Sequence, residues 1–317
     1  MATAGLDFNN SQLTVMLHAD EPELRRHRVN APEHRCNTRY CYGATGWKLP
    51  SILMYEFTYR KSDSVDEALL MFRAAAEPVY LAGGMTMLPT MKQRLSSPDV
   101  LIDLNGITAL RGIEKHDDEI VIGALTTHAQ VAASKLVQGN IPALAELASV
   151  IGDPQVRNRG TLGGSIANSD PAADYPAAVA GLNATIHTNQ RSIAADAFFV
   201  DIFETALEEG ELITHVSFPL PEMAAYKKFP NPASGYAIVG VFVARLGGVS
   251  RVAITGASGS VYRSESMEAA LNEDFAASSL ADIEIDFDDF NEDIHASAEY
   301  RAHLVAVMAQ RAVESLS

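Results

Sequence analysis

The stretch VYLAGGMTMLPTMKQRL, residues 79–95, constrains the fold most, because Gly83 and Gly84 stand between a short apolar run and a helical pattern. A second apolar run, VLIDL, follows at residues 100–104. Strand, loop, helix and strand therefore form a small α/β unit, with the loop at the carboxyl end of its first strand, where open α/β sheets bind ligands. Paired glycines also form ordinary turns. They can equally expose backbone N–H groups to an anion, so this loop alone leaves both interpretations open.

The size and charge of the chain narrow the classes of function. Its 317 residues are enough for two or three domains, and 47% of them are hydrophobic. A formal net charge of -16 opposes binding to nucleic acid or to an anionic membrane surface. No apolar run reaches the roughly 20 residues that cross a bilayer, and the first residues lack the basic-then-apolar order of a signal peptide. We therefore expect a cytoplasmic protein that neither binds nucleic acid nor spans a membrane.

Two segments differ from the rest of the chain. Residues 264–294 contain eleven acidic residues and no Lys or Arg, which indicates a solvated face or a docking surface for a basic partner. Residues 1–53 lack periodicity, and we interpret them as a disordered or mis-started extension. The spacing of Cys36 and Cys41, with no second pair, argues against a metal site. From Met54 onward there is no cysteine, so the core cannot hold a thiolate-ligated iron–sulfur cluster.

Hydrophobic periodicity predicts the remaining elements. Ser64 is a candidate helix N-cap, with Glu67 at the capping-box spacing. A second α/β subdomain is predicted from strands at 119–125 and 211–221 and from helices at 126–134 and 142–152. A separate C-terminal α+β unit is predicted from β-rich runs at 235–246 and 249–263 and from amphipathic helices at 264–271 and 297–316.

A second glycine loop lies in the middle subdomain, within RNRGTLGGSIANSDPAADYPAAV, residues 157–179. It offers glycine backbone donors, two hydroxyl groups and two carboxylates, from Gly160, Thr161, Gly163, Gly164, Ser165, Asp170 and Asp174. Neither glycine loop fits the G-x-G-x-x-G or G-x-x-x-x-G-K-[ST] spacing of the familiar nucleotide motifs. Together they predict a pyrophosphate held from two sides.

Five segments resemble the FAD-binding medium subunit of molybdenum hydroxylases, the family of carbon monoxide and xanthine dehydrogenase flavoproteins. These segments are AGGMTMLPTMKQRL, IGALTTHAQVA, IGDPQVRNRGTLGGSIANSDPAADYPAA, FFVDIFETALEEGELIT and YKKFPNPASGYAIVGVFVA. The resemblance runs from Met54 to the C-terminus and leaves out residues 1–53. It implies an α+β fold: a PCMH-type FAD-binding domain, as in vanillyl-alcohol oxidases, over residues 54–230. Its two α/β subdomains would be 54–106 and 107–230, followed by a C-terminal α+β domain of the carbon monoxide dehydrogenase flavoprotein type at 231–317.

The resemblance also implies roles for single residues toward FAD. The first loop would wrap the pyrophosphate through backbone donors of Leu81, Ala82, Gly83, Gly84, Met85, Thr86 and Met87. The adenine and ribityl walls would be Ala124, Thr127, Ile151 and Val156, and the second phosphate grip Thr161, Gly163, Gly164 and Ser165. Asp174, with Asp170 as a second candidate, would bind the adenosine end. Leu212 and Ile213 would form an apolar wall against the isoalloxazine.

The redox-active ring would be flanked by Lys228 and Tyr236. A cation near the pyrimidine end favours the negative charge that develops on reduction, and a tyrosine on one face controls access. Lys227 is adjacent, so the register of this lysine stays open. His128 and His215 are interpreted as packing or capping residues, so we expect no covalent flavin, and we assign no metal ligand to the chain.

The function implied by the resemblance is electron transfer. A large subunit with a molybdenum cofactor would oxidise the substrate, and a small subunit would carry iron–sulfur clusters. FAD in this chain would then deliver electrons to NAD, a quinone, oxygen or another acceptor, and the subunits would assemble as a dimer of heterotrimers. Two alternatives stay open: a self-sufficient flavin oxidase and a non-catalytic FAD-binding protein. The substrate cannot be read from this chain, since it would be chosen at the molybdenum site.

Overall fold

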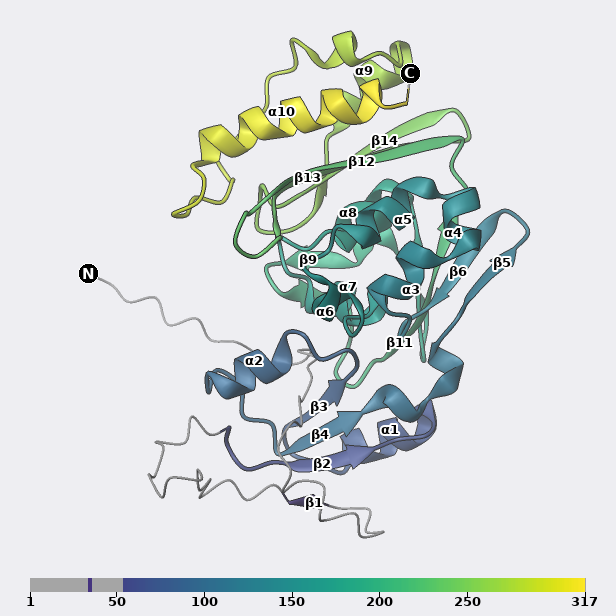
Figure 1. Ribbon diagram of the computed structural model, residues 1–317, viewed down its shortest axis with the longest axis vertical. Helices are drawn as coiled ribbons and strands as arrows, with labels where there is room; N and C mark the ends of the chain where they lie inside the picture. Colours follow the sequence, from purple (N-terminus) through teal and green to yellow (C-terminus); the bar gives the residue numbers. More distant parts are fainter. Residues whose placement is uncertain (1–33, 36–53, 317) are drawn as a thin grey trace. The chain divides into compact units, whose positions relative to one another are not determined.

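The computed structural model describes residues 34–35 and 54–316 of the chain. The chain divides into two compact units, Met1–Thr108 and Ala109–Ser317 (Figure 1). Most of the extension expected at residues 1–53 lies outside the described residues, including Cys36 and Cys41. Its described part is a two-residue strand, β1 (His34–Arg35), which pairs antiparallel with β2 (Thr58–Lys61).

The first unit contains a sheet in the order β1-β2-β4-β3, in which β2, β4 and β3 are parallel. Strands β3 (Pro78–Leu81) and β4 (Val100–Asp103) correspond to the two predicted apolar runs. The helices are α1 (Val65–Arg73) and α2 (Met87–Lys92), and the short turns η2 (Leu104–Gly106) and η3 (Thr108–Leu110) follow. The core is formed by Phe57, Val79, Leu81, Met87, Leu88, Met91 and Leu101. The predicted α/β unit is therefore present.

Both helices of this unit begin close to the positions that the sequence predicts. Ser64 caps α1, because its Oγ accepts a hydrogen bond from the backbone N–H of Glu67 at 3.2 Å. The Glu67 carboxylate binds the N–H of Asp63 at 2.9 Å, one residue away from the expected capping-box partner. Helix α2 starts at Met87, three residues after Gly84, so the glycine loop before it is short.

The second unit begins with a five-stranded antiparallel sheet in the order β5-β6-β11-β7-β8. Its strands are β5 (Ile113–His116), β6 (Glu119–Gly123), β7 (Thr185–Thr188), β8 (Ser192–Ala194) and β11 (Ile213–Pro219). The helices of this part are α3 (His128–Ala133), α4 (Lys135–Asn140), α5 (Pro142–Ser149), α6 (Pro154–Arg157), α7 (Leu162–Asn168) and α8 (Tyr175–Gly181). Alternate residues of β6 and β11, namely Ile120, Ile122, Val216 and Phe218, join the helices in one core. The subdomain thus has the predicted helices and strands, in an antiparallel arrangement.

A four-stranded antiparallel sheet completes the second unit, in the order β12-β13-β14-β15. Its elements are β12 (Met223–Pro230), β13 (Ala237–Leu246), β14 (Val249–Thr255), β15 (Tyr262–Arg263), α9 (Glu265–Glu273), η5 (Ala277–Leu280) and α10 (Ala298–Glu314). Figure 1 shows α10 lying along this sheet, and the opposite face packs on α5 and α8. Val241 joins the core under α10, whereas its neighbour Phe242 joins the core with α8. The sheet is therefore buried on both faces.

Three further observations complete the fold. The sheet starts with β12 at Met223, whereas the sequence placed the start of the last domain at 231. A turn, η4 (Ala195–Ala197), precedes a short ribbon formed by β9 (Phe199–Asp201) and β10 (Glu204–Thr205). In the described part of the chain, no helix is long and apolar enough to cross a membrane.

Candidate functional site

The first glycine loop follows β3 in the first unit. Because β2, β3 and β4 are parallel, their carboxyl ends share one edge of the sheet, and residues 82–86 begin at that edge. Gly84 has a φ of 87°, a left-handed conformation that disfavours side chains. Among the described residues, no hydrogen bond takes up the backbone N–H of Gly83 or Gly84, and Thr86 does not cap α2 with its side chain. The loop therefore has backbone donors to offer to an anion.

Asn105 fixes the start of this loop, a role that the sequence analysis missed. Its Nδ2 donates to the carbonyl oxygen of Ala82 at 2.7 Å and to Oδ1 of Asp103 at 2.6 Å. Asp103 is buried, and its other oxygen accepts from the hydroxyl of Tyr59 at 2.5 Å. Burial and the Asp103 carboxylate raise the pKa of Tyr59. An Asp-x-Asn sequence directly after a buried strand was the available signal.

The second glycine loop has its backbone donors engaged within the second unit. The N–H groups of residues 162, 163, 164 and 165 bond in order to the Thr126 carbonyl at 3.0 Å, the Ala124 carbonyl at 2.8 Å, the Thr161 hydroxyl at 3.1 Å and the Thr161 carbonyl at 3.0 Å. The backbone donors of Gly163 and Gly164, which were expected to bind a phosphate, are thus already used within the protein. In the described part of the chain, the Ser165 hydroxyl forms no hydrogen bond, so it stays available to a ligand.

Gly163 is required for packing in this loop. A Cβ at this position would lie 2.6 Å from the Cβ of Ala124 and 2.9 Å from its carbonyl oxygen. Thr161 also pairs with Thr127 in an isolated β-bridge. The Thr127 side chain is used in a capping box with Gln130, which stabilises the first turn of α3. The structure therefore brings four predicted residues together, and their mutual contacts hold the loop against the end of β6.

Asp174 and Lys228 form a buried ion pair at 2.9 Å, although 54 positions separate them in the chain. Asp174 is 3% exposed and the Lys228 side chain 6% exposed. The hydroxyl of Tyr226 also donates to the Asp174 carboxylate, at 2.5 Å. In β13, Gly240 makes room for this tyrosine, because a Cβ there would lie 2.3 Å from the Tyr226 hydroxyl. Tyr226 and Gly240 were missed by the sequence analysis.

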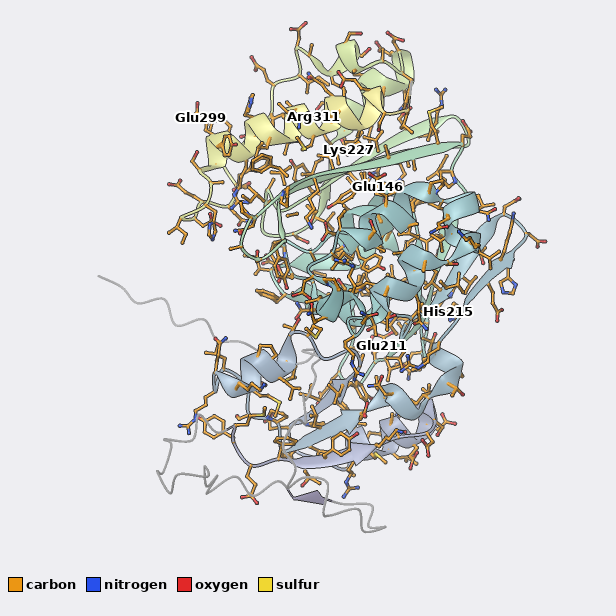
Figure 2. The ribbon with its side chains drawn as sticks, in the orientation of Figure 1. Glu146, Glu211, His215, Lys227, Glu299 and Arg311 are labelled. Atoms are coloured by element: carbon orange, nitrogen blue, oxygen red, sulfur yellow. The ribbon has the colours of Figure 1, made fainter. Side chains whose placement is uncertain are left out.

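Burial and the neighbouring groups have opposing effects on the pKa of Asp174. Burial raises the pKa of Asp174, while the Lys228 ammonium and the hydrogen bond from Tyr226 oppose that rise. Burial and the nearby carboxylate raise the pKa of Tyr226 well above its usual value, so this hydroxyl keeps its proton. Lys228 also donates to the carbonyl oxygen of Val150 at 3.2 Å. Lys227 is the more exposed of the two lysines, and its Nζ lies 3.6 Å from Glu146 (Figure 2).

The ion pair bears on two of the predicted roles. Asp174 was expected at the adenosine end of FAD and Lys228 at the flavin ring. Groups at the two ends of an extended dinucleotide lie much further apart than 2.9 Å, the distance between these two side chains. Side chains in such contact would therefore meet the same end of any such ligand that they bind. The sequence could not show this, because the contact joins the start of α8 to β12.

The segment at residues 150–157 lies near this pair, with Ile151 in the loop after α5 and Val156 in α6. Arg157 donates to the carbonyl oxygens of Ile151 at 3.0 Å and Gly152 at 2.9 Å. Val156 packs beside Gly152, and the β12–β13 loop approaches the same glycine, since a Cβ on Gly235 would lie 3.4 Å from its Cα. Of these two predicted wall residues, Ile151 therefore lies in a loop that Arg157 of α6 holds by hydrogen bonds, and Val156 lies in α6 itself.

Tyr236 and Asp170 lie in neighbouring loops. Tyr236 is exposed, as a residue that contacts a ligand would be. Asp170 accepts from the N–H of Ala172 at 2.9 Å, and burial raises its pKa. The N–H of Ala237 bonds the carbonyl oxygen of Ala172 at 3.1 Å, which ties the two loops together.

Leu212 and Ile213 are both buried at the start of β11, and Ile213 belongs to the core. Next to them, Glu211 forms an ion pair with Arg191 at 3.0 Å, and His215 follows two residues after Ile213 (Figure 2). The Arg191 guanidinium and two hydrogen-bond donors outweigh burial and lower the pKa of Glu211. The segment before β11 is thus anchored through Glu211.

The two histidines have packing roles, as expected. The His128 ring lies 5.3 Å from the Tyr175 ring, and burial with the nearby Arg157 lowers the pKa of His128 to about 4. His215 stacks on His187 with the ring centroids 4.2 Å apart. Among the described residues, no cluster of three or more His, Cys, Asp or Glu side chains could hold a metal ion.

The sequence of residues 55–221 matches the family described as the FAD binding domain in molybdopterin dehydrogenase. The chain belongs to this family. It is similar to the medium chain of carbon monoxide dehydrogenase from Hydrogenophaga pseudoflava, with 34% identity over 276 residues, 82% of this chain and 96% of that one. It is 35% identical over 275 residues to subunit alpha of the 6-hydroxypseudooxynicotine dehydrogenase complex from Paenarthrobacter nicotinovorans, covering 80% of this chain and 92% of that subunit.

A solved structure shows the same fold. Quinoline 2-oxidoreductase from Pseudomonas putida 86 has a chain with a TM-score of 0.74 and 26% identity, covering 83% of this chain and 97% of that one. The chain is thus the FAD-binding medium subunit of a molybdenum hydroxylase, a multi-subunit oxidoreductase of the carbon monoxide and xanthine dehydrogenase type. The expected α+β fold, the expected cofactor and the expected family are confirmed.

The residues of the first loop fit FAD. The pyrophosphate of FAD is an anion, and the loop supplies backbone donors beside a glycine whose backbone most side chains would avoid. The second loop fits differently, because its backbone donors are engaged and its glycine is needed for packing against Ala124. Its contribution to a ligand would come from side chains such as Ser165.

Proposed function

We propose that this chain receives electrons from iron–sulfur clusters in a partner subunit and passes them to an external acceptor by way of bound FAD. Flavin suits this position, because it accepts electrons singly and releases them as a pair. From Met54 to the C-terminus the sequence contains no cysteine, which fits clusters held by another chain. The family match supports the proposal, and the first glycine loop is the observation that carries it.

The first loop would hold the pyrophosphate. The N–H groups of Gly83 and Gly84 would bind the phosphate oxygens, with Met85, Thr86 and Met87 completing the turn into α2. Leu81 and Ala82 would set the direction of the loop, because Asn105 anchors the Ala82 carbonyl. Side-chain identity matters little for such binding, which explains why a methionine can follow the glycines.

The buried pair would serve the flavin ring. Lys228 is the lysine that points to the other predicted site residues, so we assign it, and not Lys227, to the ring. Its contact with Asp174 and Tyr226 fixes the position of the ammonium. We assign Asp174 to the same end, with Tyr236 covering one face of the ring. The ammonium would favour the negative charge that develops on reduction.

The walls of the cofactor site would come from the second unit. Ala124, Thr127, Thr161 and Gly163 would form a fixed surface, and Ile151, Val156, Leu212 and Ile213 would add apolar contacts. The Ser165 hydroxyl would bind the ligand directly, whereas Gly164 would act through its bond to Thr161. Asp170 would be a second acceptor.

The partners would be a large molybdenum subunit and a small iron–sulfur subunit, assembled as a dimer of heterotrimers in the cytoplasm. Relatives named as a medium chain and as a subunit of a dehydrogenase complex support such partners. The similar proteins carry the names of carbon monoxide, pseudooxynicotine and quinoline enzymes. Since one fold occurs with such different substrates, we propose that the substrate is selected outside this chain.

Flavin binding is tested with Gly83→Val in the full chain. We expect the purified variant to lose the visible absorbance of bound flavin, because the side chain would fill the space of a phosphate. The control is Gly139→Val in α4, where a Cβ would meet no atom within 4 Å. Flavin should remain bound in the control. Equal flavin content in Gly83→Val and wild type would refute the phosphate site at the first loop.

A further inference from the structure

A buried arginine joins the C-terminal helix α10 to the sheet beneath it (Figure 1). Arg301 is the fourth residue of α10 and is 4% exposed. The helix dipole disfavours a cation near this end of a helix, and burial removes the hydration of the cation. The Asp293 carboxylate compensates for both effects, because it accepts a hydrogen bond from Nη2 of Arg301 at 2.7 Å.

The other end of the guanidinium bridges two strand ends. Nη1 donates to the carbonyl oxygen of Ile238 at 2.7 Å and to that of Gly256 at 2.8 Å. The pairing of β13 with β14 reaches as far as Gly240 and Thr255, so both carbonyl oxygens lie just outside this ladder. Arg301 therefore extends the connection between the two strands. Its planar group holds three acceptors in one geometry, which a lysine ammonium would not reproduce.

The same strand ends hold the loop at residues 170–174. The acceptors are the carbonyl oxygens of residues 171–173. The N–H of Gly256 donates to the first at 2.8 Å, and the N–H of Ala237 donates to the second at 3.1 Å. The Thr255 hydroxyl lies 2.8 Å from the first and 2.7 Å from the third. The loop is thus fastened to the ends of β13 and β14 that Arg301 bridges.

Both fastened segments carry residues assigned to the flavin end of the site. Asp174 closes the loop at 170–174, and Tyr236 directly precedes β13. Tyr236 is 44% exposed, so its position depends on the backbone that carries it. That backbone continues into Ile238, whose carbonyl oxygen Arg301 binds. A change at Arg301 would therefore reach the flavin end through the backbone.

We propose that Arg301 is a positioning residue for the flavin, because it fixes the backbone that places Tyr236 against the ring. The inference rests on the proposed function and adds a residue of the C-terminal helix to the flavin end of the site. Arg301 acts through the two strand ends and not through contact with the cofactor. Asp293 belongs to the acidic segment 264–294, so this segment supplies the carboxylate that balances the buried guanidinium.

The first test is hydrogen–deuterium exchange of the full chain, which requires no bound flavin. Exchange is expressed relative to residues 240–244 in the middle of β13, so that a general loss of stability cancels. In Arg301→Met, the N–H groups of Ala237 and Gly256 should exchange about tenfold faster, because their strand ends lose the bridging donor. Arg301→Lys keeps the charge without the planar group, so its increase should be smaller. This variant also serves if Arg301→Met does not fold.

Two other variants of α10 are the controls. Arg311→Met removes an exposed guanidinium from the same helix (Figure 2). Met308→Ala removes a buried side chain from the core under the helix and so lowers stability without removing a hydrogen bond. Neither control should change the relative exchange of the two N–H groups by more than about twofold. Unchanged relative exchange in both Arg301 variants would overturn the inference.

The fluorescence of bound FAD tests the link to the ring, because a stacked aromatic side chain quenches flavin fluorescence. Arg301→Met should raise the fluorescence per bound FAD about threefold, while Met308→Ala should leave it unchanged. The double variant of Arg301→Met with Tyr236→Ala should match Tyr236→Ala alone. An equal rise from Arg301→Met with and without Tyr236, or the same rise in Met308→Ala, would overturn the inference. Faster relative exchange in a chain that never binds flavin would refute the proposed function, while the hold of Arg301 on the backbone would stand.

Discussion

The two glycine loops look alike in sequence but differ in the use of their backbone. In the first, Gly84 adopts a left-handed conformation, and within the described residues its N–H has no acceptor. In the second, four consecutive N–H groups are bonded inside the unit, and Gly163 is a packing position against Ala124. A glycine-rich loop is therefore not by itself a phosphate site. Such a loop can bind a phosphate through its backbone only if its N–H groups are not already bonded to another part of the chain.

The same contrast extends to charge. In the second unit, Asp174 and Lys228 of the site are paired with each other. Substitutions there should mainly lower the free energy of unfolding, whereas substitutions in the first loop should mainly weaken flavin binding. Single substitutions test this division, taken in order of decreasing effect on stability.

Lys228→Ala should have the largest effect. It leaves the Asp174 carboxylate buried with Tyr226 as its remaining partner, and breaking a buried pair in this way costs about 3–5 kcal/mol. Lys227→Ala, which removes an exposed contact with Glu146, should cost about 0–1 kcal/mol. Urea unfolding of both variants beside wild type measures the difference. Equal losses of unfolding free energy would show that the buried pair of Lys228 and Asp174 is no more stabilising than the contact of Lys227 with Glu146.

The double variant Lys228→Ala with Asp174→Asn sharpens this test, since it leaves no unpaired charge and should recover part of the loss. In flavin-loaded protein, Lys228→Ala should also lower the reduction potential. A shift on the order of 30 mV would correspond to about 1.4 kcal/mol for a two-electron couple. Spectroscopic redox titration measures it. A shift confined to Lys227→Ala would reverse the assigned register.

Gly163→Ala should have the next largest effect. The added Cβ would approach Ala124 within 2.6 Å, and overpacking of this kind costs about 1–3 kcal/mol of unfolding free energy. Gly139→Ala in α4, where the new Cβ meets open space, should be neutral or slightly stabilising. Thermal and urea unfolding compare the two. If Gly163→Ala is as stable as wild type but loses flavin, the second loop also binds flavin directly, as is proposed for the first.

Much of the fold could be predicted, because hydrophobic periodicity is a local signal. The apolar run at 79–82 became β3 (Pro78–Leu81), and the pattern at 297–316 became α10 (Ala298–Glu314). Strand β12 (Met223–Pro230) was not predicted, because MAAYKKFP has little apolar alternation and ends in proline. It is a strand because it pairs with β13 along its length.

The site could be predicted only in part, for a related reason. The sequence predicts which residues would bind FAD but not which of their groups are already bonded to another part of the chain. The N–H of Gly163 is hydrogen-bonded to the Ala124 carbonyl oxygen, and the Lys228 ammonium is paired with the Asp174 carboxylate. Both contacts depend on the fold. Asn105 was missed for the same reason, because its bond to Ala82 joins the ends of two neighbouring strands. Local motifs identified the candidates, and tertiary contacts determine which of their groups stay available to a ligand.

Gly84→Ala should have the smallest effect on stability and a clear effect on flavin. An alanine at a φ of 87° costs about 1–2 kcal/mol of backbone strain. Gly247→Ala is the matched control, because Gly247 has a φ of 56° and a Cβ there would meet no atom within 4 Å, so the substitution carries a similar strain away from the loop. Both variants should lose similar unfolding free energy. Only Gly84→Ala should release flavin, measured by fluorescence of free FAD on titration, because only there would the backbone bind the phosphate. Release from neither variant would place the phosphate elsewhere, and release from both would mean that flavin responds to global stability and that the contrast between the two loops does not govern binding.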